Sequence, residues 1–218
     1  MRFATLETST EWCSVALWRD GEIAGLERRA GNRHSELALP MLDKILNRFG
    51  MKPRELDAVA FGAGPGSFTG LRIACGLAQG LALARGIPVL GVSTLEALAD
   101  EAGAVRVGAC IDARMREVYY AALEKTDGVW REVIAPQCVA PSVVAAPGAD
   151  WIGAGSGFAV YGNMGFNKVL PEVHPTAIAV ARLAAPRLAA GQGVDAALAA
   201  PIYVREKVAF TKTELAQR

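Results

Sequence analysis

The stretch FGAGPGSFTGLR, residues 61–72, joins a short apolar run to a longer apolar segment. The run before it, LDAVAFG, has the composition of a buried strand, and Leu71–Arg85 after it has the length and composition of a helix. Its glycines permit positive φ and close approach of backbones, and Ser67 or Thr69 can cap the helix that follows. The stretch therefore predicts a tight strand-to-helix turn.

The same turn is a candidate phosphate loop, because glycine-rich turns that open a helix often hold phosphate. A Walker A loop needs a lysine after its last glycine, whereas Gly70 is followed by leucine and arginine. The dinucleotide fingerprint also fails, since Gly64, Gly66 and Gly70 contain one residue too many between them. Free N–H groups near Gly66 and Ser67 could still hold an anion. The alternative, a capped turn without a ligand, is the interpretation that we favour.

The composition is that of an ordinary globular protein. The chain has 218 residues and a formal net charge of +1, with 52% hydrophobic and 21% charged residues. It therefore has neither the basic excess typical of nucleic-acid binding nor the composition of a disordered chain. Four cysteines without a CxxC pair, and only two histidines, give no zinc pattern and favour a reducing compartment. We find no signal-peptide or membrane-spanning pattern, so we expect a cytoplasmic protein without membrane contact.

The order of predicted elements indicates an α/β fold with two lobes. Three short alternating runs lie within residues 3–29, with Asp20-Gly21 as a hairpin turn, and helices and buried strands then alternate up to Gly103. From Val105 the pattern partly restarts with three strands. We expect mixed sheets flanked by helices, in a lobe over residues 1–103 and a smaller one over 104–218.

Three segments of this pattern bear on function or on the ends of elements. The first helix, about Ser35–Phe49, carries an apolar stripe, and Ser35 or Asn32 is its expected cap. An alanine-rich helix is expected over residues 176–190, and the polar end TKTELAQR is expected to fray. In the helix after the turn, Gly76 and Gly80 are four residues apart. Glycine there costs about 1 kcal/mol relative to alanine, so a close contact, inside the protein or with a partner, is expected to compensate.

Several segments together resemble one bacterial family. The segments LETST with SVAL, HSELALP, GAGPGSFTGLR, IDARMREVYYAAL and PIYVR run from residue 6 to residue 205 and are similar to the TsaB (YeaZ) family. The resemblance implies an actin/sugar-kinase/Hsp70-type fold with two RNase H-like lobes. It implies a non-catalytic partner of the paralogous enzyme TsaD. That enzyme transfers a threonylcarbamoyl group to N6 of adenosine-37 in tRNAs that read codons beginning with A, and the ATPase TsaE joins the complex.

The resemblance also implies a docking surface on the helices of the first lobe. Family members pair through these helices with the enzyme or with a second copy, and tRNA is contacted indirectly through the complex. The candidate partner-binding residues are His34, Leu37, Met41, Ile45, Thr69, Arg72, Ile73, Gly76 and Gly80.

Catalytic machinery is not expected. Where the resemblance places two metal-binding histidines of the paralogous enzyme, this chain has Thr94 and Leu98. Leucine cannot bind a metal and threonine is a poor ligand, so we expect no metal site and no catalytic residue.

A nucleotide site remains an alternative, as in an ATP-binding phosphotransferase or ATPase of the same fold. We expect no nucleotide on the isolated chain, with ATP or ADP held only at the interface of the complex. Asp112 also reads as a turn residue or as a partner of Arg114 or Arg116, and we favour that interpretation. The candidate nucleotide or anion contacts are Glu7, Ser9, Gly66, Ser67 and Asp112.

Overall fold

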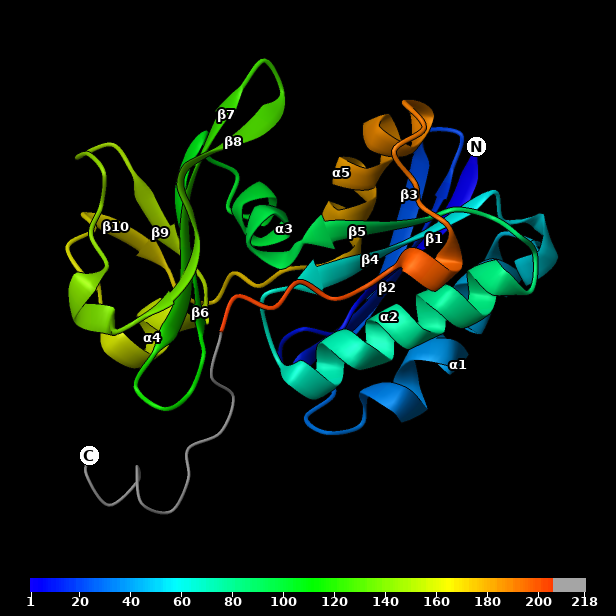
Figure 1. Ribbon diagram of the computed structural model, residues 1–218, viewed down its shortest axis with the longest axis horizontal. Helices are drawn as coiled ribbons and strands as arrows, with labels where there is room; N and C mark the ends of the chain where they lie inside the picture. The colour runs from blue at the N-terminus through cyan, green and yellow to red at the C-terminus, as the bar shows by residue number, and fades with distance from the viewer. Residues whose placement is uncertain (206–218) are drawn as a thin grey trace.

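The computed structural model describes residues 1–205 and contains two lobes, each built on a five-stranded mixed sheet (Figure 1). The expected fraying of TKTELAQR lies outside the described residues. The first sheet has the order β3-β2-β1-β4-β5 and the second the order β10-β9-β6-β7-β8. In both sheets an antiparallel three-stranded meander is extended by parallel strands, so the second lobe repeats the first. The two-lobed α/β fold expected from the sequence is confirmed.

The bounds of the elements follow the predicted order closely. The first sheet comprises β1 (Arg2–Glu7), β2 (Trp12–Arg19), β3 (Glu22–Arg29), β4 (Ala58–Gly64) and β5 (Val89–Ser93). The second comprises β6 (Arg106–Asp112), β7 (Val118–Thr126), β8 (Val129–Val139), β9 (Ile152–Ala154) and β10 (Lys168–Leu170). The helices are α1 (His34–Arg48), α2 (Phe68–Leu83), α3 (Thr94–Glu101), α4 (Ser156–Tyr161) and α5 (Ala177–Ala189), with short 3-10 turns η1 (Pro53–Glu55), η2 (Pro141–Val143) and η3 (Ala196–Leu198). Within residues 1–205, no helix is long and apolar enough to cross a membrane.

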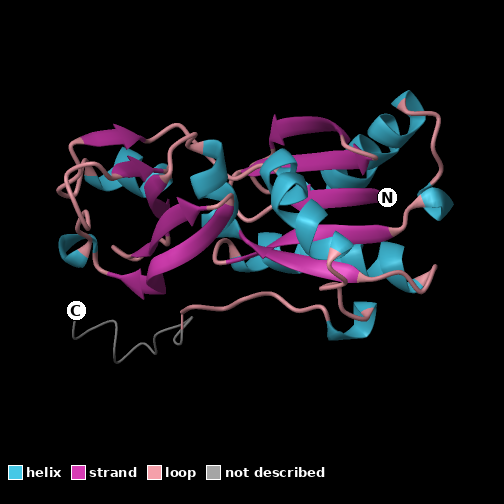
Figure 2. Cartoon of the chain, turned by 90° about the horizontal axis from the view of Figure 1, so that it is seen from above, coloured by secondary structure: helices cyan, strands magenta, loops and turns pink. Residues whose placement is uncertain are grey.

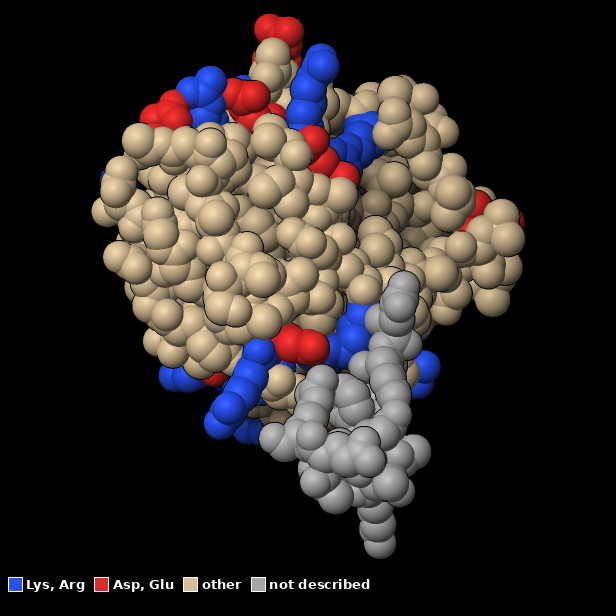
Figure 3. All heavy atoms as spheres, turned by 60° about the vertical axis from the view of Figure 1, so that its left-hand side comes forward, with Lys and Arg blue, Asp and Glu red and all other residues tan. Residues whose placement is uncertain are grey.

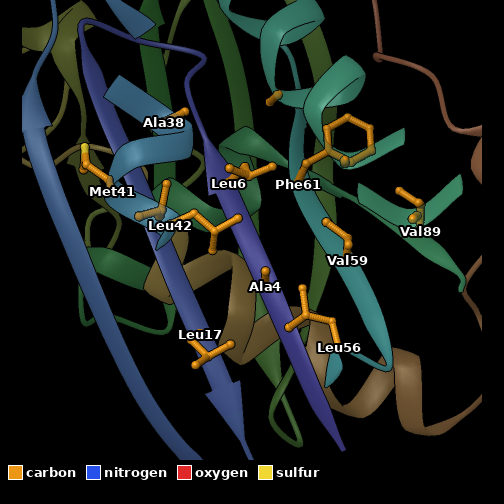
Figure 4. Packing of buried hydrophobic residues seen from close by; sticks show 14 of the residues in the cluster. Ala4, Leu6, Leu17, Ala38, Met41, Leu42, Leu56, Val59, Phe61 and Val89 are labelled. Atoms are coloured by element: carbon orange, nitrogen blue, oxygen red, sulfur yellow. The ribbon is translucent and has the colours of Figure 1, made fainter. Parts of the chain in front are cut away.

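One face of the first sheet is covered by α1 and α2. Met41 and Leu42 of α1 belong to the same hydrophobic cluster as Leu6 and Leu17 of the sheet (Figure 4). Figure 2 shows the same layering from above, with helices on both sides of this sheet. The apolar stripe of α1 is therefore an internal packing face.

The other face of the first sheet is covered by α3 and α5, and this layer joins the lobes. A single hydrophobic cluster contains Phe3 and Leu90 of the first sheet, Leu98 of α3, and Val107 and Leu123 of the second sheet. A division at residue 103 separates the two sheets, but it does not follow the packing of α5. That helix lies against β1, β2 and β4 of the first sheet, since its Val180 and Ala184 are buried there. Helix α5 thus returns to the first lobe.

The helix caps predicted from the sequence are confirmed for α2 but not for α1. Ser67 caps α2, and its Oγ accepts a hydrogen bond from Gly70 N at 3.4 Å. The expected cap of α1 by Ser35 or Asn32 was wrong. The residue at that position is Arg33, without a side-chain capping bond, and it pairs with Glu36 of the first turn instead.

The second lobe presents a face with few charges. When the left-hand side of Figure 1 is turned forward, charged side chains gather above and below a broad uncharged area (Figure 3). Residues 133–167 contain Asp150 as their single charged residue, which accounts for this surface. Exposed Val143 and Val160 belong to this segment and serve below as control positions.

Candidate functional site

The glycine-rich turn between β4 and α2 is packed against the loop that joins β1 to β2. A Cβ atom on Gly62 would lie 1.8 Å from Glu7 Oε2, and one on Gly70 would lie 1.9 Å from Thr8 O. A Cβ on Gly66 would lie 2.6 Å from Ser9 O, and Ser67 N donates to that same oxygen at 2.7 Å. The glycines are therefore required by a neighbouring loop of the chain. That loop and the turn both line the cleft between the lobes.

Glu7 lies inside this junction and not on its surface. Its side chain is buried, Ser9 N donates to Oε1 at 2.6 Å, and the Thr94 hydroxyl donates to Oε2 at 3.4 Å. Burial raises the pKa of Glu7 to about 7, against the opposing effect of the hydrogen bonds from Ser9 and Thr94. The carboxyl thus links β1, the following loop and the start of α3. It is not presented to the cleft between the lobes.

Thr94 and Leu98, the two positions at which the resemblance implies metal ligands in the paralogous enzyme, are also internal. Thr94 and Leu98 are fully buried on α3, and Thr94 Oγ1 accepts a hydrogen bond from Gly64 N at 3.1 Å. Across residues 1–205, no group of three or more His, Cys, Asp or Glu side chains is placed to hold a metal ion.

A cleft of about 1070 Å³ lies between the lobes. Its walls include the loop after β1, the start of α2 with Ser67, and the end of β6 with Asp112. Asp112 accepts a hydrogen bond from Arg114 N at 3.1 Å and forms an ion pair with the Arg114 guanidinium at 3.3 Å. The Tyr161 hydroxyl also donates to it, at 3.4 Å. These contacts agree with the interpretation of Asp112 as a partner of Arg114 within its own turn.

Three of the four candidate partner-binding residues on α1 are buried, and Leu37 is half-buried. Met41 and Ile45 are buried in the core of the first lobe, and Leu37 packs against that core. His34 is buried as well, with Nε2 2.9 Å from Thr10 O. A helical apolar stripe has the same period whether it faces a core or a partner, so the sequence could not separate the two.

The candidates on α2 form an open face. Thr69, Arg72, Gly76 and Gly80 are exposed and Ile73 is half-buried. A Cβ atom added to either Gly76 or Gly80 would meet nothing within 4 Å. The opposite face of α2 is buried against the sheet through alanines 74, 78 and 82. The small residues at 76 and 80 therefore serve no close contact within residues 1–205.

One segment beside α2 was not identified as functional from the sequence. Residues 199–205, which we call the strap, run along α2 and then reach the second lobe (Figure 1, orange to red). Gln79 Nε2 donates to Ala199 O at 3.0 Å, and Arg72 Nε donates to the Tyr203 hydroxyl at 3.2 Å. Arg205 donates to Ala113 O at 2.9 Å. The motif PIYVR was visible in the sequence, but nothing local indicated which helix it would meet.

Comparison with known proteins places this geometry in a family. The family model described as "TsaD: tRNA N6-adenosine threonylcarbamoyltransferase" matches residues 28–209. The "tRNA threonylcarbamoyladenosine biosynthesis protein TsaB" of Escherichia coli is 37% identical, over 97% of this chain and 98% of that protein. The protein of the same name from Haemophilus influenzae is 36% identical, over 95% and 94%. The solved structure of YeaZ from Pseudomonas aeruginosa superposes with a TM-score of 0.87 at 40% identity, covering 93% of this chain and 99% of that one.

Proposed function

The chain belongs to the TsaD family and, within it, to the TsaB (YeaZ) proteins, and from this premise we propose that it takes part in the biosynthesis of threonylcarbamoyladenosine in tRNA. Its role is that of a non-catalytic subunit. It binds the paralogous enzyme TsaD and favours the active conformation of that enzyme, which modifies N6 of adenosine-37 in tRNAs that read codons beginning with A. TsaE joins the complex. The subunit meets tRNA only indirectly, through the other members of the complex.

The observation that carries the docking proposal is the open glycine face of α2. Two glycines in the middle of a helix cost about 1 kcal/mol each relative to alanine, and no contact among residues 1–205 recovers this cost at Gly76 or Gly80. A partner helix that approaches closely over these positions would recover this cost. We therefore place the docking surface on Thr69, Arg72, Ile73, Gly76 and Gly80, and we leave out the buried residues of α1.

The non-catalytic role is supported by the residues that this chain has at the positions of the paralogous enzyme's functional sites. Thr94 and Leu98 are buried within the protein, and Glu7 and Ser9 close the loop against the glycine-rich turn. These contacts disfavour the ATPase or phosphotransferase alternative for the isolated chain. Nucleotide held at the junction with TsaD is compatible with them. Pairing of two copies through the same α2 face when TsaD is absent is compatible with this surface.

The test is co-elution of the purified chain with TsaD in size-exclusion chromatography. Gly76→Leu and Gly80→Leu each place a branched side chain on the open face, and each should reduce co-elution at least tenfold. Val160→Leu, which adds bulk to an exposed position on α4 of the second lobe, is the matched control and should co-elute like the wild type. Unchanged binding by both glycine variants would overturn the docking surface.

A further inference from the structure

The strap is attached to the α2 docking helix along one side. Cys75 Sγ and Gln79 Nε2 both donate to Ala199 O, at 3.5 and 3.0 Å, and Arg72 Nε donates to the Tyr203 hydroxyl at 3.2 Å. Residues 72, 75 and 79 follow one stripe of a helix, so the strap runs antiparallel to α2 beside the open glycine face. Ile202 N also donates to Ala63 O at 2.7 Å, which ties the strap to the end of β4.

Three side chains form an exposed cluster where the strap passes the first turns of α2. The Arg72 guanidinium carbon lies 3.7 Å from the centroid of the Phe68 ring, and the Phe68 and Tyr203 ring centroids are 5.5 Å apart. The relative exposure of Phe68 is 40% and that of Tyr203 is 50%. Two aromatic rings with an arginine stacked on one of them are the residue types that dominate the binding energy of protein interfaces.

Arg72 has unused donors. Within residues 1–205 its partners are the Phe68 ring and the Tyr203 hydroxyl, and no carboxylate pairs with it. A cation in the first turns of a helix also opposes the helix dipole, so its placement does not serve the stability of α2. The two remaining nitrogens of the guanidinium are free for a carboxylate of a partner, which they can bind as a fork.

Five exposed large apolar side chains lie in the same region. The exposed large apolar side chains of the described chain that lie on α2, on the strap, or on η3 beside them are Phe68, Leu83, Leu198, Ile202 and Tyr203. They lie on α2 itself or on the segment that runs along one side of it, which makes this area continuous with the proposed docking surface.

We propose that the strap is part of the surface that binds TsaD, and that the cluster Phe68, Arg72 and Tyr203 determines the affinity. This inference rests on the proposed function and deepens it. The partner chemistry that fits is a helix of TsaD with a carboxylate facing Arg72 and an apolar side chain packed on the Tyr203 ring. The modest net charge of the chain, +1, favours a protein partner at this cluster over an RNA.

The experiment measures the dissociation constant for TsaD by isothermal titration calorimetry with the full-length chain. Tyr203→Ala and Arg72→Ala should each weaken binding at least tenfold. Arg72→Glu should weaken it further, because it faces the partner carboxylate with a like charge. Tyr203→Phe keeps the ring and should bind within threefold of the wild type. The control Val143→Ala changes an exposed apolar side chain of the second lobe and should bind normally.

Two measurements separate binding from folding. Thermal unfolding of each variant should match the wild type, since the cluster is exposed. The double variant Arg72→Ala/Tyr203→Ala should lose less than the product of the two single losses, because the two side chains contact one another.

The binding data distinguish failure of the cluster from failure of the docking face on α2. If Gly76→Leu weakens binding while Tyr203→Ala and Arg72→Ala bind like the wild type, the cluster is overturned and the docking face stands. If none of the three weakens binding, both are overturned. Normal affinity for TsaD combined with reduced tRNA binding by the complex would assign the cluster to RNA. A change confined to self-association of the chain would assign it to a second copy. Either result overturns the inference.

Discussion

Glu7 and Gly62 are in direct contact across two parallel strands. The carboxyl of Glu7, at the end of β1, lies where a side chain on Gly62 of β4 would begin, since a Cβ there would be 1.8 Å from Oε2. The same carboxyl binds Ser9 N and the Thr94 hydroxyl. One buried acid therefore holds the loop after β1, the glycine-rich turn and the start of α3 together.

Gly62→Ala is expected to destabilise the protein. The added methyl group must displace a buried carboxyl from its hydrogen bonds, and overpacking of this kind costs about 1–3 kcal/mol. Urea unfolding gives the change in free energy. Gly76→Ala is the matched control, because its Cβ meets nothing within 4 Å and helix propensity alone should stabilise it by up to about 1 kcal/mol. Equal effects at the two glycines would contradict the closed junction.

The ionisation of Glu7 should make stability depend on pH. Its pKa is about 7 in the folded protein against 4.5 as the ordinary value, so between these values the folded chain holds the proton more strongly than the unfolded chain. The stabilisation is complete below the ordinary value and is lost as the pH rises through the folded value. The total corresponds to about 3 kcal/mol.

Glu7→Gln tests this pH dependence. The amide keeps an acceptor for Ser9 N but does not ionise, so the free energy of unfolding of the variant should decline less between pH 5 and pH 8. Unfolding in urea at several pH values gives the free energy of unfolding of both proteins. The titration of all other groups cancels in the difference between the two values. Parallel pH profiles would show that Glu7 has the same pKa in the folded and the unfolded chain, and would contradict the raised pKa.

Asp100 should contribute to the attachment of the second lobe. It accepts hydrogen bonds from Lys125 Nζ of β7 at 2.8 Å and Arg182 Nε of α5 at 2.7 Å. Burial acts to raise its pKa, but the bonds from these two cations outweigh burial and lower it. Asp100→Asn should cost about 2 kcal/mol at neutral pH, a figure reduced because both cations are partly exposed. This cost should disappear as the pH falls through the folded pKa of Asp100.

The control for Asp100 is Asp150→Asn. Asp150 pairs with Arg106 on the surface, where solvent screens the interaction, so urea unfolding should show little change. A larger loss at Asp150 than at Asp100 would contradict the importance of the contact between the lobes.

The isolated chain should not bind ATP. The loop after β1 fills the space against Gly66 and Gly70, and Glu7 is not accessible to a metal-bound phosphate. Calorimetry with Mg-ATP and the chain alone should give no heat of binding. Saturable binding that Asp112→Ala abolishes would instead support an ATPase or phosphotransferase.

The features that could be predicted from the sequence are those set by neighbouring residues. The turn at Asp20-Gly21 has positive φ at both residues, as its composition indicated. Ser67 caps α2 because a serine directly before a helix can bond to its third N–H. The position of Gly76 and Gly80 on one side of α2 was also expected from their spacing, whereas the sequence left open whether that side packs inside the protein or against a partner.

The features that could not be predicted depend on contacts between distant parts of the chain. Helix α5 returns to the first sheet, where Ala177 O accepts a hydrogen bond from the Thr5 hydroxyl across 172 residues of sequence. The stripe of Met41 and Ile45 has the period of a docking helix and of a core helix alike. The role of Tyr203 depends on the strap reaching Arg72, which no local pattern indicates.

The central claim is that this chain is required for the modification but does not catalyse it. The direct measurement is reconstitution with purified TsaD, TsaE, tRNA and a threonylcarbamoyl donor, followed by quantification of threonylcarbamoyladenosine in the digested tRNA. We predict that modification depends on the chain, is reduced at least tenfold with Gly76→Leu, and is absent when the chain replaces TsaD. Equal modification with and without the chain, or modification by the chain in the absence of TsaD, would contradict the claim.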